Sequence, residues 1–289
     1  MRKYIKQIIS IFLLFTPLWV HGQETARPKV WGIARMTYLV SDFKVAREYY
    51  GDFLGFDEAF SYNSPMGRVL SFKINDRQFL EFIEDKEAQT KTRLVAVWFE
   101  TDEPEQMRRY LDKCKIPVPE STLDDGAGNG YFLVHDPSGV PVAFMNYSEK
   151  GLHVKSKGKC LSDRRISERI HHAGLYSNKV MDNDPFYAGA LGFITMWRYP
   201  EDIAQKPDMM YLQIPDCIEN IEHYPSSDPN FSHPCFLVTD MQQTVYTLKS
   251  RLKGQTLSKP KIGRGNRWLL NLSNADKTKV EFTEPYTVR

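Results

Sequence analysis

The sequence predicts an α+β protein made of four βαβββ units, which form two tandem domains. Two observations support this fold class. Segments 38–56 and 175–193 resemble each other and read YLVSDFKVAREYYGDFLGF and LYSNKVMDNDPFYAGALGF. Within each copy, a strand-like run, a helical run and further strand-like runs occur twice in the same order. Similarity at a fixed spacing indicates duplicated structural units.

The first unit shows the pattern most clearly. An apolar strand is expected over 35–40, and Ser41-Asp42 after it is typical of a helix N-terminus. We expect the helix over 43–54, where apolar residues recur at helical spacing and Gly55 follows as a C-terminal signal. Strands should follow at 58–62, 69–74 and 78–83.

The remaining units repeat this order. The second unit is predicted to contain a strand over 94–99, a helix over 103–113 and a closing hairpin from 131 to 146. The second copy covers 170–221 and 232–283 in the same way. The expected domains are therefore residues 30–147 and 166–286. Segment 148–165 is polar and rich in lysine, which is typical of a linker.

The overall composition is that of a globular protein with a substantial core. The chain has 289 residues, of which 42% are hydrophobic and 26% charged. Its net charge is only +2, and no segment is strongly basic. Because binding to phosphates needs a concentrated positive surface, nucleic acid is excluded as a partner. The sequence does not predict an oligomeric state.

The N-terminus is typical of a secretory signal peptide. Arg2, Lys3 and Lys6 precede the apolar run 8–20, and Gly22 supplies a small residue at its end. The run is shorter than the roughly 20 residues that a membrane-spanning helix needs. We therefore predict that residues 1–22 are removed, that the protein is secreted or periplasmic, and that no stable membrane span is left. The alternative is an uncleaved anchor.

The four cysteines do not form a zinc motif. They show neither a CxxC pair nor zinc-ribbon spacing and lie at Cys114, Cys160, Cys217 and Cys235. In an exported protein a bridge between Cys217 and Cys235 is one interpretation. Two buried thiols are the other, and the sequence favours it slightly.

The motifs resemble those of the vicinal oxygen chelate superfamily. The resemblance rests on the Ser-Asp helix start, on Phe186-Tyr187 followed by Leu191-Gly192-Phe193, and on the closing hairpin DPSGVPVAF at 136–144. The superfamily includes glyoxalase I, bleomycin-resistance proteins and extradiol dioxygenases. The resemblance implies that two βαβββ units form one cupped sheet around a metal, with ligands from the first and last strands of each unit.

The two copies differ where metal ligands could lie. Aligning FETDEP with LVTDMQ and HDPSGVPVAF with SNADKTKVEF extends the repeat along each copy. The second copy then holds His172, His233 and Glu281 where the first holds Arg35, Val95 and Ala143. Imidazole and carboxylate groups suit a divalent ion such as Zn, Fe, Mn, Ni or Co. Each residue taken alone is more often a solvated or structural side chain, so their coincidence is the evidence.

The resemblance implies a fourth ligand from the last strand of the third unit. Glu219 is the candidate, with Glu222 as a competitor nearby. His171 should point to the opposite face from His172, because neighbouring side chains on a strand alternate. The first copy keeps only Glu81 at these positions, so we predict that its domain is degenerate and metal-free.

Three functions fit these residues. The first is a glyoxalase-like lyase or isomerase that acts on a small substrate with vicinal oxygens. It needs all four ligands, and Glu219 or Glu281 would move the proton while the metal stabilises charge on two adjacent substrate oxygens.

The second function is an extradiol ring-cleavage dioxygenase. His172, His233 and Glu281 would form its two-His-one-carboxylate iron triad. The resemblance implies that this chemistry also uses histidines outside the triad, and His223 is a candidate. The acid–base histidine that the family places in its last unit is missing, because no histidine follows His233, and this counts against the dioxygenase. Arg264 or Arg267 would have to substitute for it. The third function is a non-catalytic binding module, with Trp197, Tyr211 and Trp268 lining an apolar pocket.

Overall fold

The computed structural model describes residues 26–226, 228–252 and 256–288. The predicted signal peptide, residues 1–22, lies outside these ranges, and export stays a prediction. In the described part of the chain, no helix is both long and apolar enough to cross a membrane.

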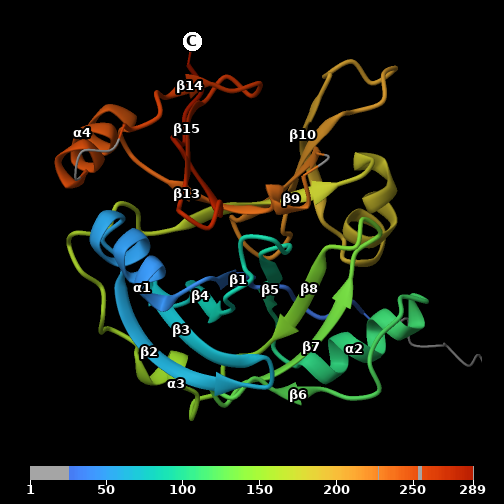
Figure 1. The fold of residues 1–289 in the computed structure, drawn as a ribbon. Coiled ribbons are helices and arrows are strands. Elements are labelled where there is room, and N and C mark those ends of the chain that lie inside the picture. Colours follow the sequence, from blue (N-terminus) through green and yellow to red (C-terminus); the bar gives the residue numbers. More distant parts are fainter. Residues whose placement is uncertain (1–25, 227, 253–255, 289) are drawn as a thin grey trace, which may run out of the picture.

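The first domain is one curled sheet of eight strands with helices on its outer side (Figure 1). The strands run in the order β2-β3-β4-β1-β5-β8-β7-β6. Their bounds are β1 (Gly32–Val40), β2 (Asp57–Ser64), β3 (Gly67–Lys73), β4 (Phe79–Glu84), β5 (Leu94–Glu100), β6 (Leu123–Asp124), β7 (Gly130–His135) and β8 (Pro141–Met145). The helices are α1 (Phe43–Ala46), the π-helix η1 (Arg47–Phe53) and α2 (Pro104–Lys113).

The second domain repeats this sheet as β10-β11-β12-β9-β13-β16-β15-β14. Its strands are β9 (Ile170–Ser177), β10 (Ile194–Tyr199), β11 (Met209–Gln213), β12 (Asn220–Pro225), β13 (His233–Leu237), β14 (Lys261–Ile262), β15 (Trp268–Ser273) and β16 (Lys279–Thr283). Its helices are η2 (Val180–Asn183), η3 (Pro185–Ala190), η4 (Pro229–Phe231) and α4 (Met241–Arg251). The predicted fold of four βαβββ units is confirmed.

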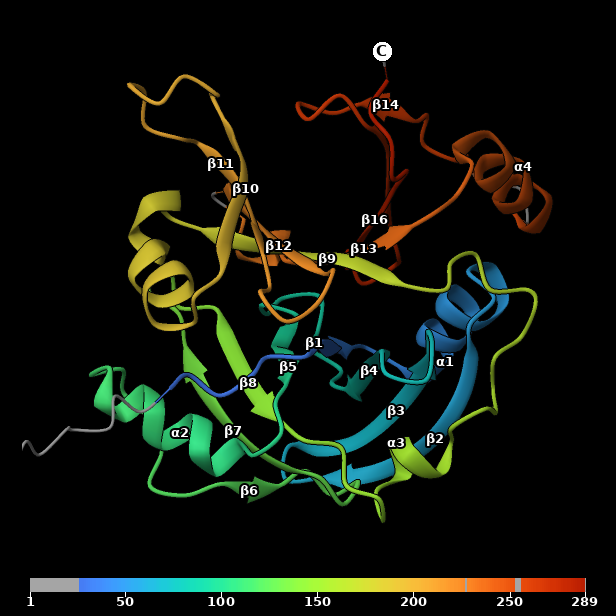
Figure 2. The same cartoon turned by 180° about the vertical axis from the view of Figure 1, so that it is seen from behind.

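Strand pairing brings the first and last strands of each unit together at the centre of the sheet. In the second domain, β9 pairs in parallel with β12 and antiparallel with β13, and β13 pairs in parallel with β16. Because alternate side chains share a face, four strands can direct one side chain each to a common point on the concave side. The two end strands of this sheet, β10 and β14, stand apart in both views (Figures 1 and 2).

The helices end where the sequence predicts. Gly55 and Gly192 close the two Leu-Gly-Phe segments with φ of +80° and +67°, a left-handed conformation that glycine adopts without strain. One turn earlier in the same helices, Tyr50 and Tyr187 are fully buried. One apolar core runs through both domains, and the Phe56 and Phe236 rings of the two domains lie 5.1 Å apart. The domains are therefore packed as a single unit.

The segment predicted as a linker contributes to the interior of the first domain. It contains the short helix α3 (Leu152–Lys155), from which the buried His153 reaches the concave side of the sheet. His153 Nε2 lies 3.0 Å from Glu81 Oε1 and 3.2 Å from Arg35 Nη1. The concave side of the first domain is thus filled by side chains from its own sheet and from the segment that follows it.

Arg35 is the centre of this buried network. Its guanidinium forms ion pairs with Glu81 at 3.1 Å and with Asp125 at 2.9 Å, and the ring of Trp98 covers it at 3.9 Å. Burial by itself would raise the pKa of Glu81, but the nearby Arg35 charge lowers it. The two carboxylates can stay ionised in the core only because the guanidinium lies between them.

We predict that Arg35→Ala destabilises the protein by about 3–5 kcal/mol, because it leaves two buried carboxylates without a cation. Urea unfolding followed by circular dichroism measures the change. Arg47→Ala is the matched control, since Arg47 pairs with Glu58 on the exposed surface and should contribute only about 0–1 kcal/mol. Equal effects of the two substitutions would show that the buried network does not stabilise the fold.

Candidate metal centre

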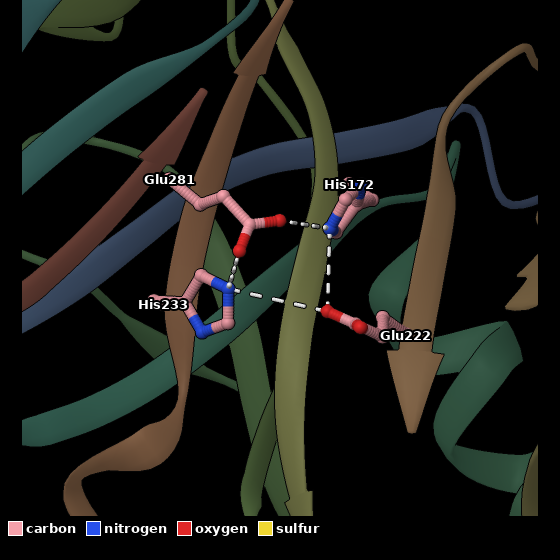
Figure 3. Close-up of side chains that lie close together, drawn as sticks. All are labelled: His172, Glu222, His233 and Glu281. Atoms are coloured by element: carbon pink, nitrogen blue, oxygen red, sulfur yellow. Dashed lines mark ion pairs between the residues drawn. The ribbon is translucent and has the colours of Figure 1, made fainter. Parts of the chain in front are cut away.

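Four buried side chains converge on the concave side of the second domain (Figure 3). They are His172 on β9, Glu222 on β12, His233 on β13 and Glu281 on β16. Each offers one ligand atom, and these atoms all lie within 4.8 Å of one another. The four central strands of the sheet therefore supply one ligand each.

The spacing of these atoms leaves room for an ion. His172 Nε2 lies 3.4 Å from Glu222 Oε2 and 3.7 Å from Glu281 Oε1. His233 Nε2 lies 4.0 Å and 3.8 Å from the same two carboxylates. Most of these separations are too long for hydrogen bonds. A cation about 2 Å from each ligand atom would bring such atoms about 3–4 Å from one another.

The hydrogen-bonding state of the cluster also fits a metal. His172 Nε2, His233 Nε2 and Glu281 Oε1 are buried and have no hydrogen-bond partner. Buried polar atoms without partners are costly, so several of them facing one point indicate a missing ligand. Two imidazoles and two carboxylates are ligands that Zn, Fe, Mn, Ni and Co accept. The residues present therefore fit a divalent cation.

Neighbouring groups orient the ligands. His233 Nδ1 lies 2.6 Å from the Phe231 carbonyl oxygen, to which it donates, so its Nε2 lone pair faces the cluster. The Tyr211 ring packs edge-on against His172 with ring centroids 5.1 Å apart, and Cys235 pairs with both His172 and Glu281 in the sheet. Contacts of this kind fix the rotamer and tautomer of metal ligands.

The electrostatics of the cluster match a cation of charge +2. Burial alone would raise the pKa of Glu222, but the imidazoles of His172 and His233 lower it to about 2. Burial and the Glu222 charge raise the pKa of Glu281. Burial, together with the Lys279 ammonium, lowers the pKa of His233 well below its usual value. A metal would bind the neutral imidazoles and displace any proton from the carboxylates.

Gly174 makes the position of His233 possible. It pairs with His233 across β9 and β13, and the imidazole lies where a side chain at this position would begin. A Cβ atom at Gly174 would lie 2.3 Å from His233 Cε1, well inside contact distance. A side chain at this position would force the ring away from the cluster.

The structure brings together three of the predicted ligands, His172, His233 and Glu281, but not Glu219. Glu219 lies in the turn before β12, where its Oε1 is 3.7 Å from Arg169 Nε and its carboxylate lies against Gly32 of the first domain. Glu222 holds the fourth position instead. The predicted ligand set, and the role of Glu219 as a catalytic base, are corrected accordingly.

Strand register explains this correction. Glu222 pairs with Gly174 in the second domain as Glu81 pairs with Thr37 in the first, so Glu222 and Glu81 are equivalent. The connections before β12 are longer than those before β4. The constant offset between the two copies does not include these extra residues, so it aligned Glu81 with Glu219 instead of Glu222. Register also places Ala96, rather than Val95, at the position of His233.

His223 is not at the centre. It follows Glu222 on β12, so it points to the opposite face of the sheet, where it is fully buried. Its Nδ1 lies 3.0 Å from Ser177 Oγ, and its ring packs 4.7 Å from Tyr187. Burial lowers its pKa to about 3. His223 is a core histidine, which corrects its prediction as a catalytic group.

His171 lies closer to the centre than strand alternation predicts. The pairing of β9 with β13 shifts register between Cys235 and Phe236, opposite His171, and this bulge lets both histidine rings meet. His171 Nδ1 lies 2.9 Å from His172 Nδ1. Burial and the adjacent His172 lower the pKa of His171 to about 2.

Two cavities reach the cluster from the concave side. One, of about 230 Å³, is lined by His172, Trp197 and Tyr211. The other, of about 780 Å³, is lined by Glu222, Glu281 and Lys279. Trp197 and Tyr211 thus lie where the sequence suggested, whereas Trp268 packs against the core. All four cysteines are thiols, so Cys217 and Cys235 are not bridged.

Comparison with known proteins finds a family match in the first domain. Residues 32–144 match the model of the Glyoxalase/Bleomycin resistance protein/Dioxygenase superfamily. The first domain is therefore similar to this superfamily in sequence. The match lies in the first domain, and the second domain repeats its fold with the same strand order. The vicinal oxygen chelate resemblance of the motifs is thereby confirmed. No curated protein sequence matches the chain.

Solved structures with this fold include several ring-cleavage enzymes. Homoprotocatechuate 2,3-dioxygenase from Arthrobacter globiformis superposes with a TM-score of 0.69 at 16% identity, covering 89% of this chain and 80% of that one. The enzyme from Brevibacterium fuscum in complex with 3,4-dihydroxyphenylacetate gives 0.67 at 17% identity, with 90% and 82% covered. The 2,3-dioxygenase LapB from Pseudomonas sp. KL28 gives 0.69 at 13% identity, with 90% and 96% covered. These TM-scores establish a shared tandem fold.

We predict that Glu222→Gln weakens zinc binding by at least about 10–100-fold, the effect that loss of an outer-sphere partner alone can have. Competition titration with a chromophoric chelator measures the affinity. Glu219→Gln is the matched control, because it makes the same substitution outside the cluster and should leave affinity unchanged. The reverse ranking of the two variants would place the fourth ligand at Glu219.

We also predict that Gly174→Ala reduces zinc affinity by at least about tenfold, because the added methyl group displaces the His233 ring. The same chelator titration applies. Gly189→Ala is the control: its nearest neighbour would be the Asp184 carbonyl at 3.6 Å, an ordinary contact. Unchanged affinity in the Gly174 variant would mean that His233 does not bind the ion.

Proposed function

We propose that the second domain is a metal-dependent lyase or isomerase that acts on a small substrate with two adjacent oxygens. The observation that carries this proposal is the fourth ligand position, the buried carboxylate of Glu222 within the same cluster as His172, His233 and Glu281. On an octahedral ion, four protein ligands leave room for two substrate oxygens. Three ligands would leave room for dioxygen as well.

The two carboxylates suit proton transfer on such a substrate. A bound divalent cation would supply Lewis-acid stabilisation of negative charge on the adjacent oxygens. Glu222 or Glu281 would take a proton from the carbon beside a carbonyl group, and the electron pair of that C–H bond would move onto the carbonyl oxygen. In an isomerisation the proton would return to the former carbonyl carbon, while the substrate hydroxyl would pass its own proton to the former carbonyl oxygen and become the new carbonyl. In an elimination a leaving group would depart with its bonding electrons from the carbon next to the deprotonated one.

The second candidate is a ring-cleavage dioxygenase. It is supported by the likeness of nearly the whole chain to solved 2,3-dioxygenases, including one that holds 3,4-dihydroxyphenylacetate. In this function His172, His233 and Glu281 would form the triad, and Glu222 would have to leave the ion. Since one fold supports many chemistries, the ligand set weighs more than the superposition.

Isotope exchange tests the proposed function whether the net reaction is an isomerisation or an elimination. We expect zinc- or manganese-loaded protein in deuterated buffer to exchange the C–H proton of simple α-hydroxy ketones, as followed by proton NMR. Glu222→Gln and Glu281→Gln should each slow exchange by about 10²-fold or more, the usual contribution of a general base. Glu219→Gln should exchange at the rate of the unchanged protein.

Oxygen consumption separates the two candidates. The proposed chemistry requires equal rates in air and under argon, and no oxygen uptake when iron-loaded protein meets catechols. Uptake of one oxygen molecule per catechol, retained in Glu222→Gln, would establish the dioxygenase and overturn the lyase or isomerase proposal.

A further inference from the structure

We propose that the substrate carries a carboxylate group and that Arg267 and His171 bind this group in the cavity beside His172. This inference rests on the proposed metal function, because it places the anion next to the atoms that the ion would hold. It adds the chemical class of the substrate, a small organic acid, and two residues that select it.

The cavity is positively charged and lacks acidic residues. None of the residues that line it is an aspartate or glutamate, whereas Arg264 and Arg267 both reach it. The guanidinium of Arg264 already has a partner, since its Nη1 lies 2.9 Å from Asp208 Oδ1. Arg267 is half-buried and forms no ion pair with any residue in the described ranges. A guanidinium sheltered from water without a counterion favours a bound anion.

His171 supplies the second donor. If His172 binds the ion through Nε2, its hydrogen is on Nδ1, and it must donate to His171 Nδ1, 2.9 Å away. His171 then accepts at Nδ1 and carries its own hydrogen on Nε2. That nitrogen lies 3.4 Å from Arg267 Nη1. The two donors cannot bond each other, so both are available to one acceptor.

A carboxylate is the acceptor that fits this pair. Two N–H groups at this separation match the two oxygens of one planar group, and the positive charge of Arg267 strengthens both bonds. Metal binding at His172 thus sets the hydrogen position that the anion needs. The two ligands should therefore favour each other's binding.

The rest of the cavity fits a small apolar body. The rings of Trp197 and Tyr211 line it with centroids 5.8 Å apart, next to Met196 and Met209. Its volume of about 230 Å³ lies below the roughly 300–1,000 Å³ of pockets for drug-sized ligands. A single ring or a short chain that carries vicinal oxygens at one end and a carboxylate at the other fits this space.

Two matched probes test the inference. Zinc-loaded protein, which cannot oxidise the probes, is titrated without oxygen by calorimetry with 3,4-dihydroxyphenylacetate and with 4-methylcatechol. The probes share vicinal oxygens and an apolar ring and differ by the carboxylate. We expect the carboxylated probe to bind at least about tenfold more tightly. Arg267→Met should abolish this preference, and Arg267→Lys should keep part of it. Arg68→Met, at an exposed position at the start of β3 in the first domain, should keep all of it.

The zinc affinity of each protein, measured alongside, separates the possible failures. If the unchanged protein binds no zinc, the metal function fails and this inference falls with it. If it binds zinc and both probes equally well, the metal function stands and the carboxylate site is overturned. A preference that survives in Arg267→Met also overturns the assignment. A preference lost in Arg267→Met, with zinc affinity retained, establishes it.

Discussion

The structure of the second domain depends on one electrostatic constraint. Two carboxylates and two imidazoles are buried together at the centre of its sheet, and the negative charge of the carboxylates has to be compensated. Glu222 and Glu281 lie on strands that pair in parallel with β9 and β13, so the fold itself holds them within reach of His172 and His233. Three atoms of this cluster have no hydrogen-bond partner. Buried charges usually need a partner of opposite charge. A divalent cation would compensate both carboxylates and accept a lone pair from each of the four side chains.

The first domain meets the same constraint with an internal cation. Register places Arg35 and Glu81 where the second domain has His172 and Glu222, and Ala96 and Ala143 at the other two positions. The Arg35 guanidinium pairs with Glu81 and Asp125. His153, from the segment between the domains, closes the space beside them. One copy of the duplicated sheet is therefore sealed by its own side chains, whereas cavities reach the other.

The sequence was sufficient for the fold and for three of the four residues of the candidate cluster, because strands keep constant spacing where they pair at the centre. That is why aligning the two copies located His172, His233 and Glu281. The alignment misplaced the fourth ligand because the length of a hairpin connection can vary. The connections before β12 are longer than their counterparts in the first domain, and the connection from β12 to β13 is shorter, so only β12 is shifted in the alignment. Strand alternation alone could have separated Glu222 from His223. The bulge that turns His171 toward His172, and the insertion of His153, depend on tertiary packing that no local pattern records.

Fold likeness and ligand set point to different chemistries here, and the physical argument favours the ligand set. The superposition on ring-cleavage dioxygenases reflects the arrangement of the two duplicated sheets. The first domain has the same sheet, although Arg35 stands there at the position of His172. Reactivity depends instead on how many positions an ion keeps open and on which bases lie beside it. As a ligand, Glu222 would change both, because it would take one position and add a second carboxylate beside the ion. A fold that holds Arg35 at the position of His172 in one domain places little restriction on the reaction in the other.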